Sequence, residues 1–333
     1  MQQPLGAVVL LLLGGSPAVK ALTHEYFIIR IYGAPATLIG YVILGWFIGL
    51  GRTSMVLFLQ LVLNVLNIAL DMLFVLGFGW GVAGVALGTV IAEMVMGGVG
   101  LCAMVWFLAD KPGTLDWQRV RSWAGFRRMA VMSRDLTIRT LGLLFAFFWF
   151  LSQGARSGDG ILAANAILMH FVTITSWFLD GFAFAAETLT GQSIGARNPR
   201  ALGQAVRLST LQAAGAALCL TVLFALSGPW VTDFLGSDAQ TRLLALDYLP
   251  WVVLVPLVGV WCYQLDGIFI GATETAIMRN VTIIPLVAYI GSWAVLFPVF
   301  GNHGLWASFI VFLVARALSL WPFYPAVRRR AIG

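Results

Sequence analysis

Long apolar stretches separated by short polar turns occupy most of the chain. Three of them cover residues 26–50, 54–76 and 81–108. Six more follow, at residues 135–153, 161–190, 202–226, 246–270, 276–299 and 305–324. An α-helix needs about 20 apolar residues to cross a bilayer, and the polar/apolar alternation of β-barrel strands is absent. The pattern therefore predicts nine full membrane spans, all helical.

A tenth apolar stretch is shorter. It covers residues 5–13, and the Met1-Gln2-Gln3-Pro4 sequence before it lacks the basic segment of a signal peptide. We therefore expect this stretch to be the second half of a further span.

Composition agrees with a membrane protein. Hydrophobic residues make up 60% of the chain, charged residues 10%, and the mean hydropathy is +0.91. Soluble domains have about 45–50% apolar and 25% charged residues. The fold class is thus an all-α polytopic membrane protein. Cys102, Cys219 and Cys262 lie in separate apolar runs without metal-ligand spacing, so we expect free thiols.

Charge marks a boundary and an orientation. Residues 109–134 carry six basic side chains, which predicts a cytoplasmic linker on the lipid headgroups. The linker separates an N-terminal lobe (residues 1–108) from a C-terminal lobe (135–325) and a basic tail (326–333). Because basic loops stay in the cytoplasm, the C-terminus is predicted to be cytoplasmic. The net charge of +6 then reflects orientation, and nucleic acid is not expected as a partner.

The two lobes share an internal repeat. GWFIGLGRTS at residues 45–54 aligns with GIFIGATETA at residues 267–276, and the same register superposes Phe78-Gly79 on Phe300-Gly301. Two loops in one register indicate two copies of one fold, each with six spans. By this repeat, we expect about 90 residues of the first copy to be missing from the chain as given.

One apolar span carries polar residues. Asn64, Asn67 and Asp71 in LNVLNIALD are spaced by three and four, so they share one face of a helix. An ionisable group at membrane depth costs roughly 3 kcal/mol unless it meets partners, water or an ion. Asp71 therefore marks a polar interior or an ion site, and a purely structural contact between helices is the alternative.

Several long motifs together resemble one family. They are RIYGAPATLIGYVILGWFIG, LNVLNIALDMLFVLG, GVAGVALGTVIAE, FLDGFAFAAETLTGQSIGAR and GVWCYQLDGIFIGAT, in this order. Together they resemble the multidrug and toxic compound extrusion (MATE) family, in its DinF-like branch. The resemblance implies two lobes of six spans each and export of amphipathic or cationic compounds in exchange for H⁺ or Na⁺. It also implies that this chain lacks spans one and two and half of span three.

The resemblance places a cation or proton site at Asn67, Asp71 and Thr89, with Asn64 on the same face. A further aspartate of the family's site belongs to span one, which this chain lacks. In the C-terminal lobe, the candidate cavity residues are Asp180, Glu187, Tyr263, Asp266 and His170. Structural roles stay open for these, and His170 has Asn165 and Thr173 as candidate partners. Glu93 is expected to pair with a basic group.

The sequence thus predicts an efflux antiporter that works by alternating access. The expected partners are a small amphipathic substrate and membrane lipid, with the protein a monomer in a bacterial inner membrane. No cofactor is expected beyond H⁺ or Na⁺ as the coupling ion, and no metal beyond Na⁺ at Asp71. A lipid-linked oligosaccharide flippase and a truncated, non-transporting membrane protein are the alternatives. No HExxH or Ser/His/Asp pattern points to an enzyme.

Overall fold

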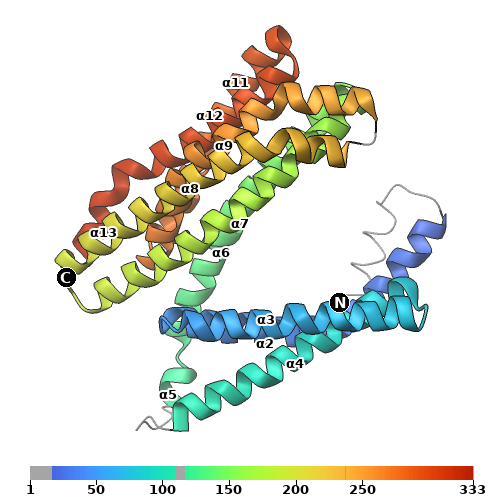
Figure 1. Ribbon diagram of the computed structural model, residues 1–333. Helices are drawn as coiled ribbons and strands as arrows, with labels where there is room; N and C mark the ends of the chain where they lie inside the picture. Colours follow the sequence, from blue (N-terminus) through green and yellow to red (C-terminus); the bar gives the residue numbers. More distant parts are fainter. Residues whose placement is uncertain (1–16, 110–116, 237, 333) are drawn as a thin grey trace. The chain divides into compact units, whose positions relative to one another are not determined.

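The computed structural model describes residues 17–109, 117–236 and 238–332, and every regular element in them is helical (Figure 1). The short apolar stretch at residues 5–13 lies outside this part of the chain. The chain divides into two compact units, residues 1–115 and 116–333, which are described separately.

The described residues of unit 1 form three long helices. They are α2 (Pro17–Gly49), α3 (Thr53–Asp71), which continues as the π-helical η1 (Met72–Gly77), and α4 (Gly81–Ala109). The turns between them use Gly51, Gly79 and Gly81 at positive φ, a conformation that glycine adopts without a steric penalty. α2 begins before the apolar stretch predicted to start at residue 26. Its first residue is Pro17, and a proline suits this position because its missing N–H is not needed there.

Unit 2 contains the remaining elements, which we list in chain order. They are α5 (Trp117–Val120), α6 (Trp123–Arg156), α7 (Asp159–Gly195), α8 (Pro199–Leu235), α9 (Ala239–Gly271), α10 (Thr275–Val281), α11 (Ile283–Phe300), α12 (Asn302–Leu320), η2 (Trp321–Phe323) and α13 (Tyr324–Arg330). Side chains of Ser122, Asn198 and Asp238 cap the first turns of α6, α8 and α9.

Nine helical segments of the described residues are long and apolar enough to cross a membrane, which confirms the nine full spans. The fourth of them, α6, begins at Trp123, well before residue 135 and inside the range expected to be a linker. The reason is local: Ser122 accepts a hydrogen bond from the Gly125 amide and starts the helix there.

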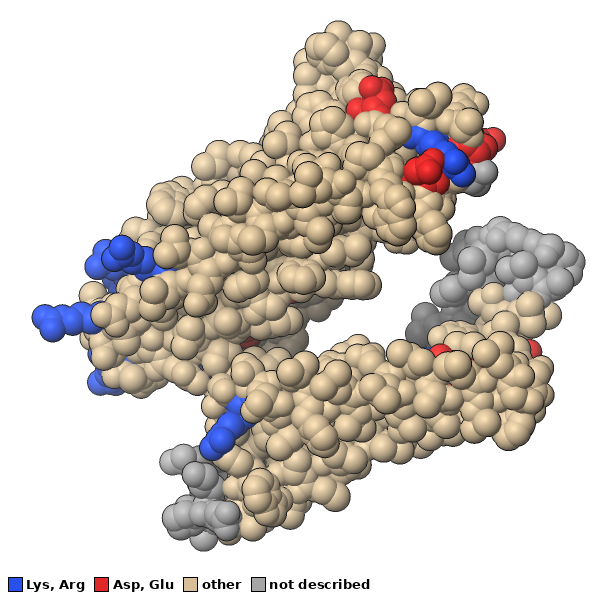
Figure 2. Space-filling view, in the orientation of Figure 1, with Lys and Arg blue, Asp and Glu red and all other residues tan. Residues whose placement is uncertain are grey.

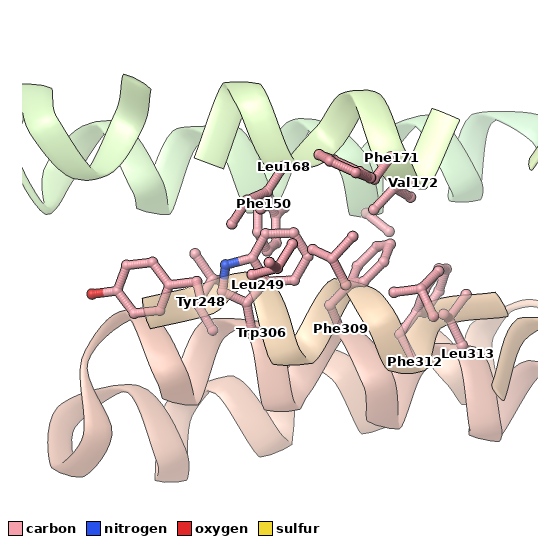
Figure 3. Close-up of a cluster of buried hydrophobic side chains, with 14 of the residues drawn as sticks. Phe150, Leu168, Phe171, Val172, Tyr248, Leu249, Trp306, Phe309, Phe312 and Leu313 are labelled. Atoms are coloured by element: carbon pink, nitrogen blue, oxygen red, sulfur yellow. The ribbon is translucent and has the colours of Figure 1, made fainter. Parts of the chain in front are cut away.

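The main core of unit 2 is aromatic (Figure 3). Trp306, Phe309 and Phe312 project from α12 toward Phe150 of α6 and Phe171 of α7, and the Phe150 and Trp306 rings meet edge to face, 4.6 Å apart. Edge-to-face pairs place the positive rim of one ring against the negative face of the other. This packing holds α12 between its neighbours.

α7 and α9 approach each other most closely at two glycines of α9. A Cβ on Gly267 would lie 2.2 Å from the carbonyl oxygen of Ala183, and a Cβ on Gly271 would lie 2.2 Å from that of Glu187. Only glycine permits such backbone contact, which is the usual role of glycines four residues apart in membrane helices.

The internal repeat appears in the helix boundaries. The register that places Gly45 on Gly267 maps both ends of α2 onto both ends of α9, and it maps the start of α3 onto the start of α10. The positive-φ positions also correspond, with Gly51 matching Thr273 and Gly79 matching Gly301. The two units therefore use one helix pattern in one register.

Candidate functional site

Three polar side chains of unit 1 converge between α3 and α4, and we call them the Asp71 site. The Asn67 Nδ2 atom lies 3.2 Å from Thr89 Oγ1 and 3.5 Å from Asp71 Oδ1. The Thr89 hydroxyl donates to the carbonyl oxygen of Val85 one turn earlier, at 2.9 Å. All three side chains are partly buried, whereas Asn64 is exposed on α3. The site thus combines one carboxylate with two neutral groups that can supply oxygen ligands.

Gly88 makes room for the carboxylate. A Cβ at this position would lie 2.5 Å from Asp71 Oδ1 and 3.4 Å from the Asp71 amide nitrogen, so a larger residue on α4 would displace the carboxylate. Asp71 is also the last α-helical residue before the π-helical η1. Short π-helical segments within longer helices occur frequently at functional sites.

A second polar contact joins α2 to α4. Arg30 binds Glu93 through both guanidinium NH groups, at 2.8 and 3.0 Å, and the Thr37 hydroxyl donates to the same carboxylate at 2.7 Å. This confirms the expectation that Glu93 pairs with a basic group. Its charge is neutralised by Arg30, so Glu93 serves to hold the two helices together.

In unit 2, Asp266 lies between two arginines, and we call the three the Asp266 cluster. Its Oδ2 atom accepts hydrogen bonds from Arg139 of α6 and from Arg316 of α12, the latter at 2.6 Å. Asp266 and Arg316 are buried, and Arg139 is largely so. With two guanidinium groups on one carboxylate, a cation at Asp266 would have to displace a strong partner.

Two other predicted residues lie beside this cluster. The Tyr263 hydroxyl hydrogen-bonds to that of Ser176 on α7, and the Arg316 guanidinium lies over the Tyr263 ring, 5.4 Å from its centre. Asp180 is partly buried and interacts electrostatically with Asp266, Arg139 and Arg316. Asp180 forms no hydrogen bond or ion pair with either arginine among the described residues, so it lies beside the cluster without joining it.

The structure does not bring Glu187 and His170 into the cluster's hydrogen bonds. Glu187 is partly buried on α7 and forms no hydrogen bond or ion pair within the described residues. His170 is exposed. Of its two expected partners, Asn165 pairs with Asn302 of α12, and Thr173 donates to the carbonyl oxygen of Met169.

Arg139, Arg316 and Gly88 were missed by sequence reasoning. The two arginines lie within apolar spans, and an ionisable residue at membrane depth is itself a signal of a functional or paired group. Gly88 is one of four glycines in α4 that pack at an interior position, and nothing local distinguishes it. Its role follows only from the contact with Asp71.

Comparison with known proteins identifies the family. The MatE family model matches residues 4–73 and 138–291, more than half of the chain. The chain belongs to the MatE family. It is 39% identical to the DNA damage-inducible protein F of Escherichia coli over 321 residues, which are 96% of this chain and 70% of that protein.

Two further matches are more distant. Protein DETOXIFICATION 44, chloroplastic, of Arabidopsis thaliana is 27% identical over 302 residues, which are 89% of this chain and 56% of that protein. A crystal structure of MATE in complex with MaL6 has a TM-score of 0.84 at 19% identity, covering 98% of this chain and 74% of that one. This likeness shows the MatE fold, and with the nine apolar helices it makes the chain an integral, multi-pass membrane protein of a transporter family.

Proposed function

We propose that this MatE protein acts as a secondary active efflux transporter in which Asp71 binds the coupling ion, H⁺ or Na⁺. The observation that supports this most is the convergence of Asn67, Asp71 and Thr89 from α3 and α4. Ion binding there alternates with export of an amphipathic or cationic organic compound by alternating access. The membrane is the bacterial inner membrane.

The chemistry of the Asp71 site suits both ions. Asn67 now directs its amide NH₂ toward the two oxygen atoms of Asp71 and Thr89. A flip of this amide presents Oδ1 in place of the NH₂ group, which gives three oxygen ligands for a hard cation. A proton on Asp71 makes the carboxyl a donor, and the Asn67 oxygen can accept from it.

The Asp266 cluster has a different role in this proposal. Its carboxylate already has two guanidinium partners, so it does not present a free negative charge to a cation. We assign ion coupling to the Asp71 site and the joining of α6, α9 and α12 to the Asp266 cluster.

Replacing the carboxylate tests the proposal. The full chain is reconstituted in proteoliposomes, and efflux of a fluorescent lipophilic cation such as ethidium is measured under a H⁺ or a Na⁺ gradient. Asp71→Asn keeps the shape but removes the charge, so ion-driven efflux should fall about 10- to 100-fold, as expected for loss of an interaction with a charged group. Asp233→Asn, at an exposed carboxylate paired with Arg242, is the matched control. Equal efflux by the two variants would disprove the assignment.

A second pair of variants leaves Asp71 itself intact. Gly88→Ala places a methyl group 2.5 Å from Asp71 Oδ1, and Gly98→Ala on the same helix meets nothing within 4 Å. Gly88→Ala should weaken the apparent affinity for the coupling ion by about tenfold, because the carboxylate is pushed from its position. Gly98→Ala should behave as the wild type. A wild-type ion affinity in Gly88→Ala would show that the position of Asp71 is not what binds the ion.

A further inference from the structure

Unit 2 has a groove that the ion site and the Asp266 cluster do not use. It has a volume of about 770 Å³ and lies between α8, α9 and the end of α12 with η2. Leu211, Leu318 and Trp321 along it are more than 60% exposed, so the groove opens at the surface of the helix bundle. Ligand sites in proteins have volumes of about 300–1,000 Å³ and apolar walls with a few polar groups.

A buried amide inside the groove has no partner. Gln264 of α9 lines the groove and is 2% exposed, and neither its Oε1 nor its Nε2 atom has a hydrogen-bond partner within the described residues. Each unsatisfied buried polar group loses its hydrogen bonds to water without replacing them. Of the seven described residues with such a group, Gln264 is the one that lines this groove. Gln264 therefore points to a ligand that offers both an acceptor and a donor.

The one charged side chain among the described residues that line the groove, Arg207, lies toward one of its ends. Arg207 of α8 lines it and forms no ion pair in the described part of the chain, and Tyr324 lies at the same end. α8 and α9 are consecutive spans, so the start of α8 and the end of α9 lie on the same side of the membrane. Arg207 is eight residues after the start of α8, and Gln264 is seven residues before the end of α9. Each therefore lies about 10–12 Å from this side. Leu257 precedes Gln264 by seven residues on α9 and so lies about 10 Å farther from the end of that helix, and the apolar Val314 of α12 also lines the groove.

The polar end adjoins the basic end of unit 2. Arg197 and Arg200 precede or begin α8, and Arg328–Arg330 end α13. In Figure 2 most visible basic side chains of this unit gather at one end, and most acidic ones at the other. Basic pockets between membrane helices bind anionic lipid headgroups, because each nearby Lys or Arg attracts the negative charge.

We propose that this groove is a binding site for one anionic phospholipid of the adjoining leaflet, of the phosphatidylglycerol type. The phosphate binds Arg207. The Gln264 amide nitrogen donates to an ester carbonyl, and its oxygen accepts from a hydroxyl of the headgroup. An acyl chain lies along the apolar end, against Leu257 and Val314. The lipid thereby provides hydrogen-bond partners for the Gln264 amide and a negative charge for the Arg207 guanidinium.

Native mass spectrometry of the purified full chain tests this with phosphatidylglycerol and phosphatidylcholine of the same acyl chains as probes. The wild type should bind phosphatidylglycerol about tenfold more tightly than phosphatidylcholine. Arg207→Gln should remove this preference, because the charge-assisted contact is lost. Gln264→Leu should weaken binding of both lipids several-fold. Arg200→Gln, at a basic position of the same helix outside the groove, is the charge-matched control and should keep the preference.

A third variant blocks the groove without changing any charge, so it tests the proposal even if the loss of an arginine alters folding. Ala214→Trp fills the groove from α8 and should abolish tight binding of either lipid. Unchanged lipid binding in Ala214→Trp, or equal effects of Arg207→Gln and Arg200→Gln, would overturn the proposal. Displacement of phosphatidylglycerol from the wild type by tetraphenylphosphonium, a lipophilic cation, would overturn it too, since the groove would then be a substrate site.

Discussion

Two aspartates in membrane spans of this protein have opposite surroundings. Asp71 lies beside two neutral polar groups, Asn67 and Thr89, and against the Cα of Gly88. Asp266 lies between two arginines. A carboxylate without a cationic partner can take up H⁺ or Na⁺, whereas one held by two guanidinium groups is already neutralised. In the proposed mechanism, the neighbours rather than the residue type therefore distinguish the ion-binding Asp71 from the structural Asp266.

The Asp266 cluster predicts a large loss of stability on substitution. Asp266→Asn leaves the buried Arg316 and the largely buried Arg139 without their carboxylate, which should lower the free energy of unfolding by about 3–5 kcal/mol. Asp233→Asn breaks an exposed ion pair with Arg242 and should cost less than about 1 kcal/mol. Unfolding of the purified variants in SDS/detergent mixtures measures both. Similar stabilities would contradict a structural role for the cluster.

At the scale of the element, the two copies of the repeat differ in what their glycines contact. Gly267 and Gly271 of α9 touch the backbone of α7. Gly45 and Gly49 correspond to them in α2, and a Cβ added to either would meet nothing within 4 Å. Among the described residues, these two glycines of α9 therefore contact a neighbouring backbone, whereas Gly45 and Gly49 of α2 have no such neighbour within 4 Å.

This contrast supplies a matched pair of variants. Gly267→Ala puts a methyl group 2.2 Å from the Ala183 carbonyl oxygen, so α7 and α9 must separate, and we expect a loss of about 1–3 kcal/mol. Gly45→Ala meets no atom of the described residues within 4 Å and should change stability by no more than about 0.5 kcal/mol. The midpoint of unfolding in SDS/detergent mixtures compares them. If the two substitutions cost the same, the close contact of α7 with α9 is not important for stability.

At the scale of the whole molecule, the turns at opposite ends of the helices differ in charge. The turn from α7 to α8 and the end of α13 are basic, whereas the turn from α8 to α9 carries Asp233 and Asp238. Basic segments near membrane spans are retained on the cytoplasmic side. We therefore propose that the α7–α8 turn and the C-terminus lie in the cytoplasm.

Cysteine labelling in intact cells checks this topology. In a chain whose three native cysteines are replaced by alanine, a membrane-impermeant maleimide should label Asp159→Cys, at the start of α7, from outside. It should label Arg200→Cys, at the start of α8, only after permeabilisation, because α7 separates the two positions by one span. The reverse pattern of labelling would show that the orientation is inverted.

The sequence by itself determined the nine full spans and the register of the repeat. It also determined that Asn67 and Asp71, four residues apart, share a helix face. These features depend on local hydropathy and on helix periodicity, so they can be read from neighbouring residues. α6 begins at Trp123, where Ser122 caps its first turn, so the second part of the segment predicted to be a linker is helical and continuous with the span.

Only the tertiary structure decided which side chains meet across helices. Arg139 and Arg316 reach Asp266 from 127 and 50 residues away, and Gly88 of α4 faces Asp71 of α3. The unpartnered amide of Gln264 likewise became visible only inside the groove that α8, α9 and α12 form together. Such contacts depend on how the helices pack against one another, and no periodic pattern in the local sequence predicts them.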